Sequence, residues 1–259
     1  MAYLISVANQ KGGVAKTTTV VSLGAALVHQ GAQVLVIDLD PQANLTMSLG
    51  VEPSSVHQSI ANILLNQNPM LSAIRSTSVQ GLDLIPSNTE MELAERFLPI
   101  RKNYKYILRE ATNSLPEYNY LIFDCPPSLG AVTTNALQAS HLLIIPTQAE
   151  YFSISALRSM LKFIQRERDQ GNPNLIYRIL LTMYDQRNRI HRTLRDQLQV
   201  TFYEGLFQQI IGIDTKLRES SVVGLPITDY NPKTRSATQY TALAQELKQH
   251  VQEYVVRFV

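Results

Sequence analysis

The chain has 259 residues, of which 45% are hydrophobic and 17% charged, and its formal net charge is +2. This length and composition can bury a full core as one domain over residues 1–259, and no apolar run reaches the roughly 18 residues of a membrane span. A single cysteine excludes a disulfide framework, and a strand that starts at the N-terminus without a signal peptide predicts a cytoplasmic protein.

The first predicted elements are a buried strand over residues 3–8 and a helix from about Lys16 to His29, joined by a glycine-containing loop. A helix N-terminus behind a glycine loop directs backbone N–H groups at a phosphate. In such a site Lys16 would reach the β- and γ-phosphates, and the Thr17 hydroxyl would bind Mg²⁺. The loop reads Lys11-Gly12-Gly13-Val14-Ala15-Lys16-Thr17-Thr18.

The loop departs from the strict pattern G-x-x-x-x-G-K-[ST], because Gln10 and Ala15 stand at its two glycine positions. The alternative interpretation is a Gly-Gly turn between two surface lysines. We favour the phosphate site, because the strand, the glycines, both lysines and Thr17 are all in register.

Acidic residues follow two further predicted strands, over residues 33–37 and 120–123. Asp38 and Asp40 come after the first of these strands, and Asp124 comes directly after the second. Ligands of open α/β sheets bind beyond the carboxyl ends of the strands. A single carboxylate there is an ordinary polar strand end, but three of them beside a phosphate loop predict a shared nucleotide site.

The remaining segments alternate between helices and apolar strands. Helices are predicted over residues 45–65 with a break near Pro53, and over 90–98, 104–114, 154–168, 188–201 and 238–257. Strands are predicted over 82–86, 141–146, 175–181 and 210–211. Because the strands are apolar without alternation, we predict an α/β fold with a doubly wound, mostly parallel twisted sheet and helices on both faces.

The second lysine of the loop, Lys11, gives the pattern K-G-G-x-x-K-[ST]-T. This pattern resembles the deviant Walker A motif of the ParA/MinD group of P-loop ATPases. The resemblance runs from Ile5 to Leu247 and includes segments similar to Soj-type proteins at 180–185, 217–220, 224–227 and 230–232. It implies a slow, Mg²⁺-dependent ATPase with ATP and Mg²⁺ as cofactors. Its nucleotide-binding residues would include Gly12, Gly13, Val14, Ala15, Lys16, Thr17 and Thr18.

The resemblance also implies roles for the acidic side chains. Asp124 would be the Walker B carboxylate that holds Mg²⁺ through water, with Thr17 as a further metal ligand. Asp38 would lie close to the metal and the lysines, and Asp40 would position the attacking water. Together with Lys16, these residues form the expected catalytic set.

Two further features of the site are implied by the resemblance. Lys16 already supplies the cation that one phosphate loop needs, so Lys11 would reach the phosphates of a partner across an ATP-dependent homodimer. The adenine would lie between Met183 and Pro226, in an apolar slot suited to a π face, although either residue could equally fill the core.

Basic side chains gather in two segments that are candidates for contact with DNA. ParA-type proteins bind DNA nonspecifically as ATP dimers, which requires cations on one face. In the first segment, the spacing of three arginines makes most of one helical face cationic. The alternative is a solvated helix face, because Asp185 and Asp196 lie close by. The candidates are Arg187, Arg189, Arg192 and Arg195, followed by Lys216, Arg218, Lys233 and Arg235.

The implied function is that of a positioning switch in the cytoplasm of a bacterium. ATP would close the dimer, the dimer would bind the double-stranded DNA of the nucleoid, and a ParB-like or other adaptor would stimulate hydrolysis. The cargo would be a plasmid, a chromosome or a protein organelle, and nothing in the sequence chooses between them.

Two other classes of protein remain as alternatives. A MinD-like ATPase would bind a membrane through its last helix, where Val251, Tyr254, Val255 and Phe258 form one stripe. The polar face of that helix carries few cations, which favours a helix docked on the core. A metabolic relative of the nitrogenase iron protein or dethiobiotin synthetase would need a pair of cluster cysteines or a substrate pocket. Cys125 alone cannot supply the former, and the sequence identifies no candidate for the latter.

Overall fold

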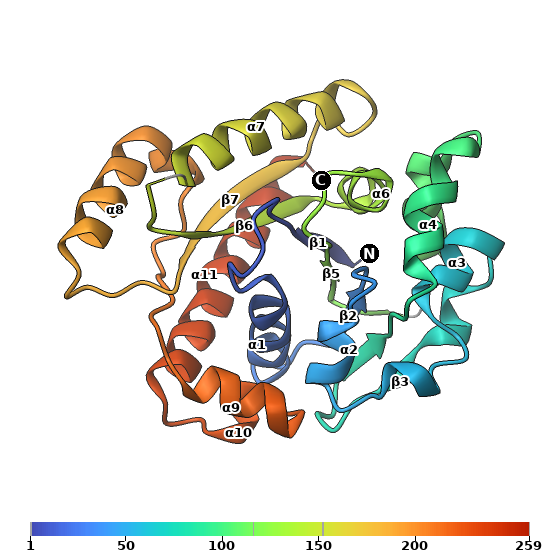
Figure 1. Cartoon of the computed structure of the whole chain (residues 1–259), viewed down its shortest axis with the longest axis horizontal. Coiled ribbons are helices and arrows are strands. Elements are labelled where there is room, and N and C mark those ends of the chain that lie inside the picture. Colours follow the sequence, from blue (N-terminus) through green and yellow to red (C-terminus); the bar gives the residue numbers. More distant parts are fainter. Residues whose placement is uncertain (1, 116, 152, 259) are drawn as a thin grey trace.

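The computed structural model describes residues 2–115, 117–151 and 153–258, with the side chains of all of these except residues 204 and 253–258. Within this part of the chain, seven strands form one sheet in the order β3-β4-β2-β5-β1-β6-β7 (Figure 1). All neighbouring strands are parallel except β3 and β4, which pair antiparallel. The predicted doubly wound, mostly parallel fold is confirmed. The strands are β1 (Tyr3–Val7), β2 (Val34–Asp38), β3 (Arg75–Ser76), β4 (Leu82–Ile85), β5 (Tyr120–Asp124), β6 (Leu142–Gln148) and β7 (Ile176–Thr182).

The central strands are fully buried because helices cover both faces of the sheet. Alternate residues of β2 enter different cores: Leu35 and Ile37 pack on one face, and Val34 and Val36 on the other. Helices α3 to α7 cover the first face, while α1, α10 and α11 cover the second. The helices are α1 (Lys16–Val28), α2 (Asn44–Ser48), α3 (Ile60–Asn66), α4 (Met91–Phe97), α5 (Ile107–Thr112), α6 (Ala131–Ala139), α7 (Ser153–Asp169), α8 (Arg189–Phe202), α9 (Lys216–Val223), α10 (Ile227–Tyr230) and α11 (Arg235–Phe258).

The structure confirms the break expected near Pro53: the predicted helix over 45–65 is two helices, α2 and α3, separated by a 3-10 turn at Pro53–Ser55. The predicted strand at residues 210–211 is wrong, because this segment forms no strand of the described sheet and instead runs beside the end of β7. There the Ile211 N–H donates to the Leu181 carbonyl at 2.9 Å. Further 3-10 turns lie at Met70–Ala73, Leu98–Ile100, Tyr104–Tyr106 and Tyr203–Gly205.

Helix α6 was not predicted from the sequence. All nine of its residues are buried, so it lacks the alternation of polar and apolar faces that marks a surface helix. It fills the connection between β5 and β6, directly behind Asp124.

Helix α11 packs against α1 along the second face of the sheet (Figure 1). Tyr240, Leu243 and Leu247 are fully buried there, and Val251 is partly buried against the same core. The other members of the predicted stripe, Tyr254, Val255 and Phe258, lie outside the described side chains. Across the described residues, no helix combines the length and apolar character needed to span a bilayer.

Candidate nucleotide-binding site

The loop between β1 and α1 has the backbone geometry expected of a phosphate loop. Gly13 and Ala15 both adopt positive φ angles, of 72° and 65°, and α1 begins at Lys16 as predicted. A Cβ on Gly13 would meet nothing within 4 Å, so glycine is required there for its conformation rather than for space. The turn aims the first N–H groups of α1, which have no partner within the helix, at the cavity.

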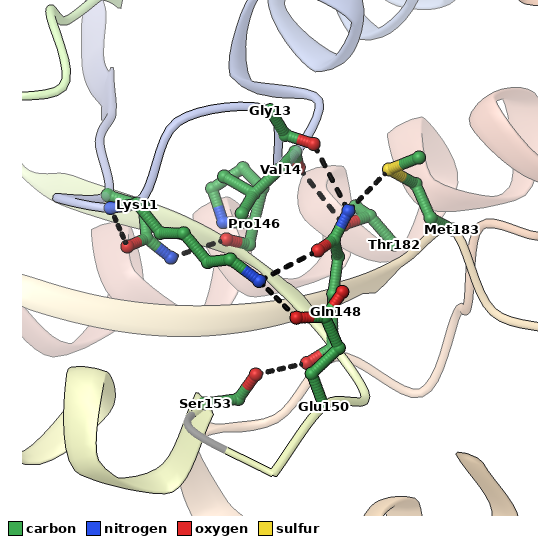
Figure 2. A network of polar contacts seen from close by, with 10 residues as sticks. Lys11, Gly13, Val14, Pro146, Gln148, Glu150, Ser153, Thr182 and Met183 are labelled. Atoms are coloured by element: carbon green, nitrogen blue, oxygen red, sulfur yellow. Dashed lines mark hydrogen bonds and ion pairs between the residues drawn. The ribbon is translucent and has the colours of Figure 1, made fainter.

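The loop is held in place by side chains from the ends of neighbouring elements. Asn9 donates to the Pro146 carbonyl at 2.7 Å and accepts from the Lys11 N–H at 3.0 Å. Gln148, at the end of β6, donates to the Gly13 carbonyl, and Thr182, at the end of β7, donates to the Val14 carbonyl (Figure 2). The loop is thus fixed before any ligand arrives.

A cavity of about 610 Å³ opens beside this loop, within the size range of small-molecule sites. Met183 also lines it, with a positive φ of 53°, and its Sδ accepts from Gln148 Nε2 at 2.7 Å. Val14 does not line it, because this side chain is buried beneath the loop. Pro226, which the family resemblance placed beside the base, is not among the described residues that line it. The lining includes Gly12, Gly13, Ala15, Lys16, Thr17, Thr18, Asp40, Ile213, Asp214, Thr215, Leu217 and Arg218.

The three predicted carboxylates meet at this edge of the sheet. Parallel register places Asp38 opposite Asp124 on neighbouring strands, and Asp40 lines the cavity. Asp38 is fully buried and its oxygens are engaged: Oδ1 accepts from the Asp40 N–H at 3.1 Å, and Oδ2 accepts from the N–H and hydroxyl of Thr46. Asp124 is also buried, but within the described residues neither of its carboxylate oxygens accepts a hydrogen bond.

Burial is the largest influence on the pKa values of Asp38, Asp124 and Lys16. It raises the pKa of Asp38 to about 7, against the hydrogen bonds from Thr46. It also raises the pKa of Asp124 well above its usual range; the charge of Asp38 adds to the effect, while the nearby Thr17 hydroxyl and the charge of Lys16 oppose it. Burial lowers the pKa of Lys16, although the carboxylates of Asp124 and Asp40 act in the other direction. Two buried acids beside one desolvated amine favour the binding of a further cation, and the open Asp124 oxygens can hold it.

Lys11 lies apart from the cavity. Its Nζ donates to Gln148 Oε1 at 3.0 Å and forms an ion pair with the Glu150 carboxylate (Figure 2). The Lys11 and Glu150 side chains are 37% and 48% exposed. Lys16 is buried and donates to the Lys11 carbonyl at 3.2 Å, so the two lysines of the loop point to different surroundings.

The predicted basic residues divide into those with partners and those without. Arg187 pairs with Asp185, Lys216 pairs with Glu219, and Arg235 donates to the Ile213 carbonyl. Arg192 donates to the carbonyls of Gln186 and Arg187, which fixes the turn before α8. Among the described residues, the side chains of Arg189, Arg195 and Lys233 form no hydrogen bond or ion pair, and Arg218 lines the cavity. The segments around α8 and α9 occupy different sides of the molecule in Figure 1.

Sequence reasoning missed Asn9, Thr46, Ser87, Gln148 and Thr182. Gln148 and Thr182 end strands in the same way as Asp38 and Asp124, so the same argument could have found them. Asn9 and Ser87 each lie two residues beyond the end of a strand, as Asp40 does, so the argument extends to them; Thr46 lies in the short helix α2, and no sequence spacing connects it to the site.

The strand order, the phosphate loop and the carboxylates at the strand ends define a P-loop nucleotide-binding protein. A family model described as an AAA domain matches residues 2–177. The sporulation initiation inhibitor protein Soj of Bacillus subtilis is 36% identical over 249 residues, which cover 95% of this chain and 98% of Soj. The chromosome partitioning protein ParA of Caulobacter vibrioides is 34% identical over 248 residues, covering 94% and 93%. The chain therefore belongs to the ParA/Soj family of P-loop ATPases.

Solved structures agree with this fold. Cobyrinic acid a,c-diamide synthase from Mycobacterium smegmatis, with bound ADP and magnesium, has a TM-score of 0.86 and 35% identity, and the match covers 97% of this chain and 96% of that one. The septum site-determining protein MinD from Pyrococcus horikoshii, complexed with Mg-ADP, has a TM-score of 0.78 and 23% identity, with coverage of 97% and 98%. The latter likeness concerns the fold alone.

Proposed function

We propose that this chain acts as a single-domain ParA-type switch that binds ATP and Mg²⁺, dimerises on ATP and hydrolyses it slowly. The observation that supports the proposal most is the division of the two lysines. Lys16 is buried in the cavity beside the carboxylates. Lys11 lies outside the cavity, and the side chains of its ion pair with Glu150 are partly exposed to solvent. One loop thus offers a cation to its own phosphates and a second cation to those of another molecule.

The residues of the site account for the binding of ATP. The N-terminus of α1 and the loop N–H groups receive the phosphates, and Lys16 neutralises their charge. Thr17 would bind Mg²⁺ and Asp124 would hold it through water, a use that suits the Asp124 oxygens because they accept no hydrogen bond within the described residues. When bound, Mg²⁺ neutralises the phosphate oxygens on which charge develops. Met183 lines the cavity and is the residue proposed to contact the base.

The hydrolytic step is assigned to the acidic residues. Asp40 lines the cavity and orients the attacking water. Asp38 accepts a hydrogen bond from the Asp40 N–H and lies opposite Asp124 on the neighbouring strand. Lys11 of the partner would supply the remaining positive charge at the transferring phosphate, where exclusion of water makes a cation most effective. A monomer without that cation would hydrolyse ATP slowly.

Light scattering of Lys11→Ala with ATP tests the trans role. The variant should fold and bind ATP, because Lys11 does not line the cavity, yet it should stay monomeric. The matched control is Lys102→Ala, which removes an exposed lysine far from the site and should dimerise normally. Dimerisation of Lys11→Ala at wild-type ATP concentrations would refute the proposal.

The ATP dimer is further proposed to bind nonspecific duplex DNA of the nucleoid and to release it when an adaptor of the ParB kind stimulates hydrolysis. Arg189 and Arg195 support this, because their charges are not neutralised by described neighbours. Salt-sensitive binding to arbitrary duplex DNA with ATP, and not with ADP, is expected. A MinD-like membrane protein is the alternative, and co-sedimentation with anionic liposomes in place of DNA would favour it.

A further inference from the structure

Two buried hydroxyl residues connect the acidic loop after β2 to the loop after β4. Thr46 lies in α2 and Ser87 follows β4, and both are fully buried. The Thr46 hydroxyl donates to Asp38 Oδ2 at 2.7 Å and accepts from the Ser87 N–H at 2.9 Å. The Ser87 hydroxyl donates in turn to the main-chain carbonyl of Asp40 at 2.7 Å.

We propose that Thr46 and Ser87 are positioning residues for hydrolysis, which hold Asp38 and Asp40 in the geometry that orients the attacking water. This inference rests on the proposed ATPase function. Neither residue lines the cavity, so each acts through a carboxylate rather than on the nucleotide.

The contacts of Asp40 explain why its position depends on this network. Its N–H donates to Asp38 Oδ1, and its carbonyl accepts from the Ser87 hydroxyl and from the Ala43 N–H at 2.9 Å. Its Oδ1 accepts from the Gln42 N–H, also at 2.9 Å. The other carboxylate oxygen accepts no hydrogen bond within the described part of the chain, which leaves it for a water molecule.

Thr46 is suited to this position by its chemistry. A hydroxyl offers one donor and acceptor lone pairs, so it can serve Asp38 and the Ser87 N–H at the same time. Valine has the same shape but would leave the buried Asp38 oxygen short of a donor and the Ser87 N–H without an acceptor. Serine would keep both contacts. The pair Thr46→Val and Thr46→Ser therefore separates the hydroxyl from the packing of α2.

Catalysis is more sensitive to this geometry than binding is. A reacting group displaced by about 1 Å can cost on the order of 100-fold in rate. ATP binding depends on the loop over residues 11–18, which Asn9, Gln148 and Thr182 hold independently of Thr46. Loss of the hydroxyl network should therefore lower kcat and leave the affinity for ATP unchanged.

Steady-state ATPase kinetics, binding of a fluorescent ATP analogue and thermal unfolding of Thr46→Val, Thr46→Ser and Ser87→Ala test the inference. We expect Thr46→Val and Ser87→Ala to lower kcat by roughly 10- to 100-fold with unchanged nucleotide affinity. Thr46→Ser keeps the hydroxyl and should keep a kcat close to that of the wild type. The matched control is Ser140→Ala, because Ser140 is also buried and its hydroxyl contacts the Ala136 carbonyl and the Ser6 hydroxyl rather than Asp38 or Asp40. It should keep the wild-type kcat.

Three outcomes would overturn the inference: a wild-type kcat in Thr46→Val and Ser87→Ala, a kcat in Thr46→Ser as low as that of Thr46→Val, or a loss of nucleotide affinity that parallels the loss of kcat. Ser87→Ala keeps the Ser87 N–H contact with Thr46 and carries the test even if Thr46→Val does not fold. Wild-type protein that fails to hydrolyse ATP would instead refute the proposed function itself, and this inference with it.

Discussion

The contact between Lys11 and Glu150 leads to a quantitative prediction about dimerisation. If Lys11 must reach a partner's phosphates, it has to leave Gln148 and Glu150 first (Figure 2). Glu150→Gln keeps the size of the side chain and removes the charge that holds Lys11. The variant should therefore dimerise more readily than the wild type.

The magnitude follows from the exposure of the pair. Both side chains are more than one-third exposed, and such ion pairs contribute only about 0.2–1 kcal/mol. Two of these contacts must break in each dimer, so their combined effect is a rise of about 2- to 30-fold in the dimerisation constant. A hydrogen bond to Gln148 remains, which keeps the change modest.

Sedimentation of the Glu150→Gln variant with ATP, in the Asp40→Ala background that we expect to block hydrolysis, measures this constant directly. The difference from wild type should shrink at high salt, because screening weakens exposed ion pairs. Glu92→Gln is the control, since Glu92 is an exposed acid on α4 and its loss should change nothing. An unchanged or weaker dimerisation constant for Glu150→Gln would refute this reasoning.

Three other predictions concern the carboxylates and the basic residues. Asp40→Ala should bind ATP and dimerise but lose about 100-fold or more in kcat, and single-turnover hydrolysis near the wild-type rate would contradict its role. Because burial raises the pKa of Asp38 from 3.8 to about 7, the folded state keeps a proton that the unfolded state has lost. The stability of the metal-free protein should therefore fall as pH rises through this range, and urea unfolding of Asp38→Asn should show a shallower fall. Arg189→Ala with Arg195→Ala should reduce the salt dependence of DNA binding by a slope of up to about two, whereas an unchanged slope would exclude these residues from the interface.

The sequence was most informative where the signal is local. The apolar strands, the glycine loop with Lys16 and the acids at the strand ends each lie within a few consecutive residues, and the structure brings them together as expected. Helix α6 lacked a signal because it is buried on every side. The strand expected at residues 210–211 was wrong because an apolar pair can pack beside a sheet without joining it.

The strand ends indicate where the supporting residues lie, but their contact partners could not be predicted from spacing. Gln148 meets the phosphate loop more than 130 residues away only because β6 and β1 are parallel neighbours. Ser87 reaches Asp40 for the corresponding reason, since β4 pairs with β2 in parallel. Such contacts depend on register across the sheet, and register is a property of the fold rather than of any one segment.

Helix α4 lies between the loop that carries Asp40 and the loop that follows Asp124. Ser87 precedes this helix by four residues, and its hydroxyl donates to the Asp40 carbonyl. Within the helix, both carboxylate oxygens of Glu95 accept from N–H groups at the start of α6, those of Ala131 and Val132, each at 2.9 Å. Helix α6 follows the loop behind Asp124, and a Cβ on Gly130 would lie 1.6 Å from Glu95 Oε1, so glycine is required for this close approach. Because both loops are anchored on α4, a displacement of this helix would move Asp40 and the loop behind Asp124 together.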